Sequence, residues 1–411
     1  MKKLPLLLPF LLLLACGQEE TAVTEAECFQ LAAGTHSPRL TQDDDDISVS
    51  YVKTSGEKSS LFVQPIHLPF EKVILKNELR SGTDWFINWA DFPSVVKYKD
   101  SLGNNVQFSH WLQYSGEGTY DYDIYAAIEY SEPKEHFKLH KDTVAAEHGF
   151  LSSAPIPGGG LQVSWLDGRF TKQVSLKADE PTVDDHGHGG GGAMTLRTKA
   201  LSDDTSVELD HRVCDCCNTA TVATDSLIMV AYRDRSEHEI RDIAYVTKPT
   251  SDDEWSTPKL VHADNWEING CPVNGPALAA NDAGNIAVVW YTAPADLAQI
   301  NFARYDPNAD SFNFPILLDD EIPLGRVDIQ LADDGAAYVT GITTKEGTDD
   351  AFLTLWTISP TDEVEREELT ITSAARSSGF PEIALFEDKL YWVRTVLGVE
   401  KEEQFVEVCW R

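Results

Sequence analysis

Three cysteines stand within four positions of the segment HRVCDCCNTA: Cys214, Cys216 and Cys217. Cys271 is a fourth sulfur, placed just before a later strand of the pattern described below. Four thiolates suit a soft or borderline metal such as zinc or Cu(I). When oxidised, they form two disulfides that lock neighbouring loops. Cys-x-Cys-Cys is not a standard zinc spacing, so the sequence favours disulfides and leaves a metal site with His148 as a further ligand as the alternative.

Arginines form a second candidate set. Arg212, Arg326 and Arg376 each precede an expected inner strand, and Arg169 follows another strand. In so acidic a chain, several arginines on one face indicate an anionic ligand, because a guanidinium grips a carboxylate bidentately. Asp328 follows Arg326 in LGRVD, and Asn274 lies in NGCPVNGP, which leads into another inner strand; the two complete the predicted substrate-binding set.

Three further arginines, Arg233, Arg235 and Arg241, have acidic neighbours in YRDR and EIRDI. Charges that are partly buried are commonly paired. The sequence therefore favours a bracing role for these three over ligand binding.

Candidate catalytic residues are fewer. Asp91 and Glu147 precede expected inner strands and could serve as general acid and base, although no spacing marks them as a pair. Tyr291 is the tyrosine that the pattern places near the channel, where it would act as a nucleophile.

Short β-strands rather than helices are expected to position these residues. From about residue 85 the chain shows runs rich in β-branched and aromatic residues, separated by turn signals such as PGGGL and NDAGN. One set of runs recurs about every fifty to seventy residues: VQFSHWLQY, LQVSWLDGR, LIMVAYRDR, IAVVWYTA, AAYVTGITT and KLYWVRTV. Each run has one strand before it and another after it. This repetition predicts an all-β fold, a six-bladed β-propeller of four-stranded antiparallel blades.

The ring needs a closing strand, because the sixth unit ends with the chain. The segment SLFVQPI, residues 60–66, is expected to supply it, so the propeller is predicted to span residues 60–411. If an N-terminal strand pairs beside QFVEVCWR, Cys28 and Cys409 meet as a disulfide that clasps the ring.

The polar residues named above are expected at one mouth of the ring. Strands of an antiparallel meander reverse direction, so the start of strand one, the end of strand two and the loop to strand three share a face. The segments that lead into inner strands are NWADFP, AEHGF, RVCDCCN, NGCPVNGP, LGRVD and ARSSGFP. The loop DDHGHGGGGAM, with His186 and His188, belongs to the same face. Ligand sites on rigid scaffolds are commonly built from such loops, so this mouth is the predicted working face.

The first residues have the pattern of an export signal. Two lysines precede an apolar run over residues 4–14, which is too short for a comfortable transmembrane helix. Its end, LLAC, resembles the lipobox of bacterial lipoproteins. The resemblance implies a signal peptide over residues 1–15, acylation of Cys16 and an acylated N-terminal linker over 16–59. Gly17 in place of aspartate favours the outer membrane, so the expected location is the bacterial cell envelope.

The charge limits the partners. The formal net charge is −34, which repels nucleic acid and anionic lipid, so the sequence argues against both as partners. Six cysteines remain beside Cys16. An even number in an exported protein favours disulfides over free thiols.

With these residues set out, the chain resembles the sialidase superfamily, whose members are also called BNR-repeat proteins. The resemblance rests on the six-fold arrangement, on the arginines before inner strands and on the turns SEPKEHF, SDDEWSTP and PNADSFNFP, which look like incomplete Asp-box turns. The motifs EHGF, WLDGR, RVCDCC, YRDRS, EIRDI, CPVNGP, GRVD and SGFP are similar to those of a family of sialidase-like bacterial lipoproteins. The resemblance covers roughly residues 85–411.

The resemblance implies a site as well as a fold. Sialidases clamp the substrate carboxylate with three arginines and use a tyrosine partnered by a glutamate as nucleophile, with an aspartate as acid. Arg212, Arg326 and Arg376 match the arginines by position. The tyrosine–glutamate pair has no clear counterpart in the sequence, and NWADFP stands where the Phe-Arg-Ile-Pro motif is expected.

Three functional hypotheses follow. The first is a membrane-anchored propeller that binds an acidic sugar such as sialic acid, with exo-α-sialidase-like hydrolysis as its enzymatic form and no cofactor required. The second is a metal-binding propeller that holds copper or zinc through the Cys/His cluster. The third is a non-catalytic scaffold in the envelope. The expected partners are the membrane, through Cys16, and an acidic glycan, and the sequence identifies no protein partner.

Overall fold

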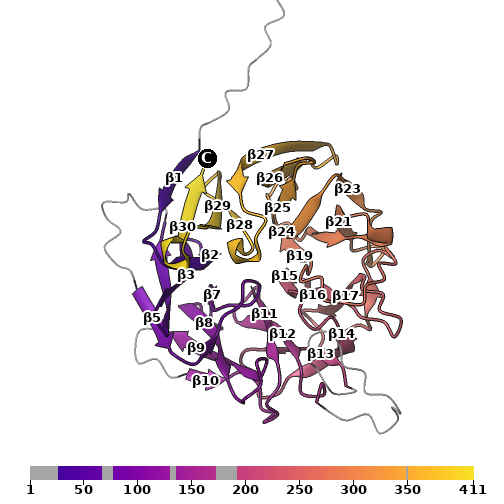
Figure 1. The fold of residues 1–411 in the computed structure, drawn as a ribbon. Helices are drawn as coiled ribbons and strands as arrows, with labels where there is room; N and C mark the ends of the chain where they lie inside the picture. The colour runs from indigo at the N-terminus through magenta and orange to yellow at the C-terminus, as the bar shows by residue number, and fades with distance from the viewer. Residues whose placement is uncertain (1–25, 67–76, 130–135, 173–191, 349) are drawn as a thin grey trace, which may run out of the picture.

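The computed structural model describes residues 26–66, 77–129, 136–172, 192–348 and 350–411. In this part of the chain, seven antiparallel sheets stand around one axis (Figure 1). The predicted all-β propeller of antiparallel four-stranded blades is confirmed, but the ring has seven blades and not six. The expected signal peptide, Cys16, His186 and His188 lie outside the described residues.

The blades are numbered here in chain order. Blade 1 consists of β2 (Thr35–Gln42), β3 (Ile47–Ser55), β4 (Lys58–Pro65) and β5 (Asn77–Gly82). Blade 2 consists of β6 (Trp85–Phe86), β7 (Ser94–Lys99), β8 (Asn105–Tyr114), β9 (Tyr122–Glu129) and β10 (His136–Lys138). Blade 3 consists of β11 (His148–Pro155), β12 (Leu161–Asp167), β13 (Met194–Ala200) and β14 (Val207–Val213).

The remaining blades follow the same order. Blade 4 consists of β15 (Ala220–Ala223), β16 (Leu227–Arg233), β17 (Ile243–Pro249) and β18 (Lys259–Leu260). Blade 5 consists of β19 (Ala277–Ala280), β20 (Ile286–Thr292), β21 (Gln299–Asp306), β22 (Ser311–Phe312) and β23 (Ile316–Asp319). Blade 6 consists of β24 (Pro323–Leu331), β25 (Ala337–Thr344), β26 (Ala351–Ile358) and β27 (Val364–Thr372). Blade 7 consists of β28 (Glu382–Phe386), β29 (Lys389–Val396), β30 (Phe405–Trp410) and β1 (Glu27–Gln30).

Blade 1 is the blade that the six-fold prediction lacks. The segment 60–66 was expected to close the last blade, but it lies in β4, the third strand of a blade of its own. Strands β2 and β3 occupy much of the expected linker 16–59, so the propeller begins well before residue 60. Buried and partly exposed side chains do not alternate regularly along β2 and β3. Both faces of a blade pack against neighbouring blades, so neither face is exposed to solvent.

The ring closes through β1, which pairs antiparallel with β30. Cys28 lies opposite Cys409 in that register, and the two form a disulfide. The predicted clasp is therefore confirmed, with residues 27–30 rather than 60–66 as the closing strand.

The core lies between the blades. Each of the seven junctions between neighbouring blades has its own cluster of buried apolar side chains in the described residues. Phe108 of β8 packs with Trp165 of β12, for example, and Trp290 of β20 packs with Met229 of β16. Burial of this apolar surface, at about 25 cal/mol per Å², holds adjacent blades in a fixed relation and so fixes the loops at their ends.

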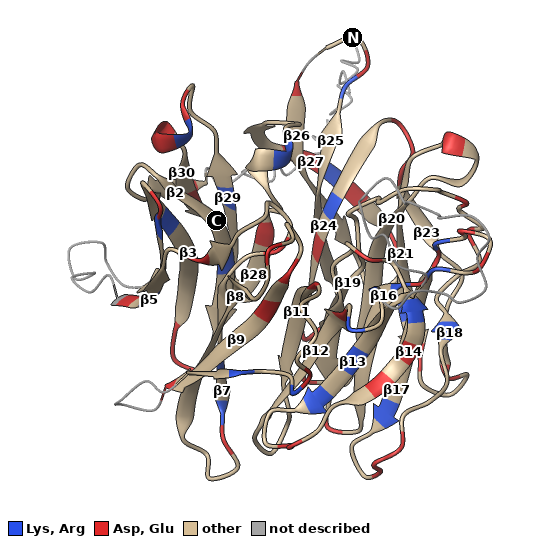
Figure 2. Ribbon diagram, turned by 60° about the horizontal axis from the view of Figure 1, so that its bottom comes forward, with Lys and Arg blue, Asp and Glu red and all other residues tan. Residues whose placement is uncertain are grey.

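The charges lie outside these clusters. Figure 2 shows Asp and Glu on strands and loops of many blades. Among the described residues, no helix is long and apolar enough to cross a membrane.

Candidate functional site

The loops at one mouth of the propeller are joined by a continuous chain of hydrogen bonds. The backbone N–H of Cys214 donates to the carbonyl of Arg233 (3.0 Å), and the Arg233 guanidinium donates to the carbonyl of Asn274 (2.8 Å). The side-chain oxygen of Asn274 accepts the backbone N–H of Arg326 (2.8 Å), and Arg326 reaches the loop 374–379. The structure therefore brings these predicted residues to a single mouth.

Arg326 is engaged by the protein itself. One terminal nitrogen donates to the carbonyl of Ala375 (3.0 Å) and to the hydroxyl of Ser378 (2.9 Å), and the other donates to the carbonyl of Ala374 (3.0 Å). The guanidinium lies 5.0 Å from the ring centre of Trp89. Burial lowers the pKa of Arg326 to about 10. These contacts tie loop 374–379 to blade 6 and leave the guanidinium little to offer a ligand.

The other two arginines of the sialidase resemblance lie elsewhere. Arg376 is exposed in the turn η3 (Arg376–Ser378), 6.0 Å from the Trp89 ring. Arg212 ends the outer strand β14, where it lines a separate groove and contacts Glu239 (3.4 Å). The structure thus places Arg326 and Arg376 within 6.0 Å of the centre of one indole ring and sets Arg212 apart from them.

The arginines expected to brace the mouth do so. Arg235 pairs with Asp215 (2.7 Å) and Glu239 (2.9 Å), and Arg241 pairs with the other oxygen of Glu239 (2.7 Å). Arg233 is 1% exposed, and its guanidinium donates to backbone carbonyls. Ion pairs between the loop after β14 and the loop after β16 therefore hold the mouth in shape.

A cavity of about 240 Å³ lies on the channel axis, where the inner strands begin. Its charged lining consists of Arg39, Asp91, Asp328 and Glu382. Serine and threonine hydroxyls and the rings of Phe92 and Phe150 complete much of the wall. A concave site with a few convergent polar groups is the usual form of a small-ligand site.

Arg39 is the cation of this cavity. Its guanidinium pairs with Glu382 and lies 4.7 Å from the ring centre of Phe92. The second oxygen of Glu382 accepts the backbone N–H of Leu40 (2.8 Å). Arg39 was not a sequence candidate, because its segment was expected to be a linker. The segment THSPRLTQ has one strongly apolar residue, Leu40, and a proline, so it carries no clear strand signal.

Two carboxyls in the cavity have raised pKa values. Asp91 is 4% exposed and accepts the backbone N–H of Phe150 (2.8 Å), and burial raises its pKa to about 7. Asp328 accepts the backbone N–H of Ile383 (2.8 Å), and burial raises its pKa to about 6. Groups that titrate near neutrality suit general acid–base work. The structure places both predicted residues in one cavity.

Glu147 has a partner that the sequence did not reveal. The hydroxyl of Tyr122 donates to Glu147 Oε1 (2.7 Å), and both side chains are buried. Burial raises the pKa of Glu147 to about 8, and the charges of Asp215 and Asp91 add to the effect. Tyr122 is the first residue of β9, the third strand of blade 2. Because successive strands reverse direction, the start of a third strand lies at the same mouth as the start of an inner strand, where Glu147 was expected.

Gly149 joins this pair to Asp91. A Cβ at Gly149 would overlap the Asp91 carboxylate and stand 3.1 Å from the ring of Tyr122. Glycine at this position therefore allows Asp91, Tyr122 and Glu147 to pack around one point of the backbone.

Tyr291, Asn274 and Arg169 are placed outside the cavity lining. Tyr291 is half-buried with its ring 5.6 Å from that of Trp266, and burial raises its pKa. Asn274 donates to the carbonyl of Leu324 (3.2 Å) and so supports the neighbouring loop. Arg169 makes a two-pronged ion pair with Asp167 (2.6 Å for each contact). All three hold structure at the mouth.

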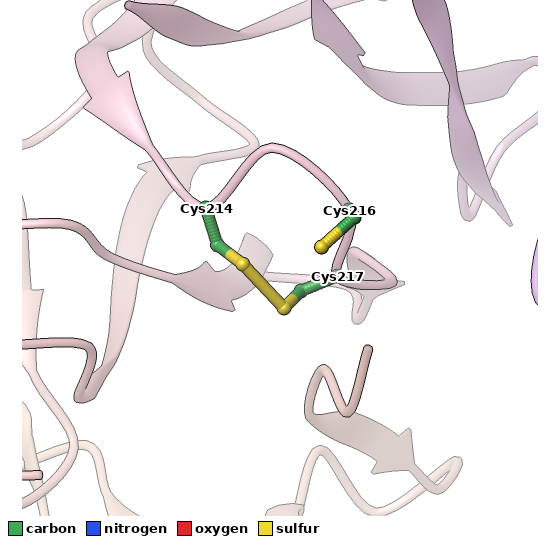
Figure 3. Close-up of side chains that lie close together, drawn as sticks. All are labelled: Cys214, Cys216 and Cys217. Atoms are coloured by element: carbon green, nitrogen blue, oxygen red, sulfur yellow. A yellow bond between two sulfur atoms is a disulfide. The ribbon is translucent and has the colours of Figure 1, made fainter. Parts of the chain in front are cut away.

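The cysteine cluster is oxidised, as the sequence favoured. Cys214 pairs with Cys217 (Figure 3), and Cys216 pairs with Cys271 across the gap between blades 4 and 5. Disulfide sulfurs lack the thiolate charge that binds metal. A cysteine metal site would therefore require both bridges to be reduced.

His148 is not part of the cysteine cluster. It opens β11 and meets a histidine and three aspartates from blades 2 and 3. Among the described residues, this group is the second candidate site for a metal ion.

No protein-family model matches the chain, and no curated protein matches it. Solved structures match at low identity. A protein of unknown function from Dyadobacter fermentans is 10% identical with a TM-score of 0.48, over 80% of this chain and 97% of that one. The polysaccharide lyase Uly1 is 9% identical with a TM-score of 0.49, over 91% and 89% of the two chains. A mutant NanB sialidase from Streptococcus pneumoniae is 8% identical with a TM-score of 0.45, over 93% and 94%. These similarities concern the arrangement of strands and do not bear on the ligand of this chain.

Proposed function

We propose that this protein is a lipid-anchored, glycan-binding propeller of the bacterial envelope, which takes the carboxylate of an acidic sugar such as sialic acid into its channel cavity. The observation that carries the proposal is the position of Arg39, a guanidinium on the channel wall beside Asp91, Asp328 and Glu382. Among the arginines of the mouth, Arg39 takes the role that the sequence gave to Arg326.

The cavity suits a sugar in size and lining. Its volume of about 240 Å³ lies below the usual 300–1,000 Å³ of ligand pockets, so it would hold one sugar unit, with the rest of a glycan in the mouth. The hydroxyls of Ser94 and Ser152 contact His110 and Thr221, and their remaining lone pairs can accept hydrogen bonds from sugar hydroxyls. Phe92 and Phe150 offer apolar surface.

Protonation of the cavity decides how well it accepts an anion. Below about pH 6, Asp91 and Asp328 are both protonated, and Arg39 then faces one carboxylate, Glu382. Above pH 7, three carboxylates surround the guanidinium and repel a bound carboxylate. Affinity for an acidic sugar should therefore rise as the pH falls from 8 to 5.5.

Binding, rather than hydrolysis, is the proposed activity. A sialidase-like reaction needs a tyrosine hydroxyl in contact with the sugar. Tyr122 has the required glutamate partner, but its side chain is fully buried beneath Phe86, with ring centres 4.1 Å apart. Turnover would first require Tyr122 to be uncovered.

Calorimetry with free sialic acid on the mature chain tests the proposal. We expect binding at pH 5.5, at least tenfold weaker binding at pH 8, and loss of binding in Arg39→Met. Arg376→Met is the matched control, because the arginine-triad hypothesis expects that variant to lose binding and ours does not. The double variant Arg39→Met, Glu382→Met removes both members of the ion pair, so it separates loss of binding from loss of folding.

Two results would refute the proposal: the absence of binding heat at both pH values, or unchanged affinity in folded Arg39→Met. The anchor is tested separately. Cys16→Ala should move the protein from the membrane fraction to the soluble fraction, and a fluorogenic sialoside reports any turnover.

A further inference from the structure

Five ionisable side chains meet between blades 2 and 3. They come from β9, from the segment after β10 and from the ends of β11 and β12: Asp123, His140, Asp142, His148 and Asp167. Both imidazole side chains are 0% exposed. Nothing in the proposed sugar site uses this cluster.

Backbone contacts fix the tautomer of His148. Its Nδ1 lies 3.1 Å from the carbonyl oxygen of Ala146 and 3.3 Å from that of Tyr122. A carbonyl can only accept, so Nδ1 carries the hydrogen and the neutral ring presents its lone pair at Nε2. A histidine ligand whose other nitrogen donates to a backbone carbonyl is the usual arrangement at metal sites.

His148 Nε2 has no hydrogen-bond partner among the described residues. It faces two carboxylates, with Asp142 Oδ2 at 3.3 Å and Asp167 Oδ1 at 3.6 Å. A lone pair directed at two carboxylates is repelled unless a cation lies between them. A proton on Nε2 would draw one oxygen to about 2.7–2.9 Å. A tetrahedral ion with bonds of about 2.0–2.2 Å instead holds its ligand atoms about 3.3–3.6 Å apart.

The second histidine supports this arrangement and cannot share the ion. Its ring stacks on that of His148 with centres 3.8 Å apart and 13° between the planes. Because a metal lies in the plane of each imidazole that binds it, two parallel stacked rings do not bind one ion. His140 Nδ1 lies 2.6 Å from Asp142 Oδ2 and donates to it, which orients that carboxylate.

Basic side chains contact each of the three carboxylates in the cluster. Lys138 pairs with Asp123 (2.8 Å), and His140 Nε2 lies 3.3 Å from the other oxygen of Asp123. Arg169 pairs with both oxygens of Asp167 and lies 3.3 Å from Asp142 Oδ2.

We propose that Asp142, His148 and Asp167 bind one divalent metal ion of the zinc class, through two carboxylate oxygens and one imidazole nitrogen. Asp142 is the ligand with access to solvent, since its side chain is 11% exposed. Nitrogen and oxygen ligands of this kind favour zinc and its neighbours over copper(I), which prefers sulfur. The ion fixes the loop 139–147 that carries Glu147 into the mouth, so it is a structural support of the working face.

The test uses Zn²⁺ and Co²⁺ as probes on the full mature chain, first stripped with a chelator. We expect one equivalent of Zn²⁺ per chain by elemental analysis and a rise of several degrees in Tm on addition of Zn²⁺. Asp142→Asn should weaken Zn²⁺ binding at least 100-fold. Asp328 lies in the channel cavity and not in this cluster. Asp328→Asn is therefore the matched control and should bind Zn²⁺ with the affinity of the wild type.

A second pair of measurements separates this site from the cysteines. Cys214→Ser with Cys217→Ser should keep the equivalent of Zn²⁺, and the Co²⁺ form should lack thiolate–cobalt charge-transfer bands. Absence of Zn²⁺ and Co²⁺ uptake by folded wild type, retention of full affinity by Asp142→Asn, or loss of the metal in the cysteine variant would each overturn the proposal. Sugar binding is measured independently, so either proposal can fail alone.

Discussion

Tyr122 donates its hydroxyl hydrogen to Glu147 across 2.7 Å, and neither side chain is more than 5% exposed. The pair stands beside Asp91, whose pKa is also raised by burial. The raised pKa values of Asp91 and Glu147 mean that both carboxyls change their charge within the range from about pH 6 to pH 9. The stability of this mouth should therefore depend on pH.

Glu147 provides the clearest test. Its pKa is raised to about 8 in the folded protein, against an ordinary value of 4.5. Between these values the folded state holds a proton that the unfolded state releases, so this contribution to stability is complete below pH 4.5 and is lost as the pH rises to 8. We expect Glu147→Gln to make the fall in unfolding free energy between pH 5 and 8 shallower, by up to roughly 1.4 kcal/mol per pH unit.

Urea denaturation at pH 5, 6, 7 and 8 measures that slope. Glu239→Gln is the matched control, because the pKa of Glu239 is lowered: burial opposes this, but its ion pairs with Arg235 and Arg241 outweigh burial. That variant should lose stability evenly across the range. Equal slopes for the wild type and Glu147→Gln would show that Glu147 does not hold its proton in the folded state.

Gly149 should be intolerant of a side chain. A Cβ there overlaps the Asp91 carboxylate, so Gly149→Ala must displace Asp91 from the Phe150 N–H. We expect a loss of about 1–3 kcal/mol in unfolding free energy and weaker sugar binding in the channel. Gly270→Ala, where the nearest atom is 4.0 Å away, should change neither quantity. If Gly149→Ala binds sialic acid with unchanged affinity in calorimetry, Asp91 does not contribute to the ligand site.

Most of the blades could be predicted from the sequence, because the six runs from VQFSHWLQY to KLYWVRTV all lie in second strands. Blade 1 could not be predicted by the same route. Its strands lie between the expected signal peptide and the repeating region, and β4 has the composition of a closing strand. A closing strand and the third strand of a blade are equally apolar when both faces are packed. Only the pairing of β1 with β30 separates the two cases.

The site could be predicted in location but not in its contacts. Strand alternation depends only on chain direction, and it predicts the two carboxyls Asp91 and Asp328 that line the cavity. Glu147 pairs with Tyr122 outside that lining. Whether an arginine binds a ligand or a carbonyl depends on loop conformation. Arg326 meets the carbonyls of loop 374–379, and this choice leaves no trace in local sequence.

Arg326 should therefore matter for folding more than for ligand binding. Arg326→Met leaves the carbonyls of loop 374–379 without their donors, and unsatisfied buried groups cost about 1–3 kcal/mol each. We expect a fall of roughly 3 kcal/mol in unfolding free energy, partly restored in Arg326→Lys, with sialic acid affinity changed less than twofold in both. If Arg326→Met loses affinity for sialic acid while its unfolding free energy is unchanged, Arg326 binds the ligand.

The clasp between the chain ends gives the last prediction. Cys28 and Cys409 are 381 positions apart, so their disulfide restricts a very long loop in the unfolded chain, whereas Cys214 and Cys217 are 3 apart. Loop-closure entropy grows with loop length, so removal of the first bridge should cost about 3–5 kcal/mol and removal of the second about 2 kcal/mol or less. Paired cysteine-to-serine variants, unfolded in urea without reductant, measure both costs. A smaller cost for the Cys28–Cys409 bridge would mean that β1 holds to β30 without it, and that pairing of the strands rather than the sulfur bond closes the ring.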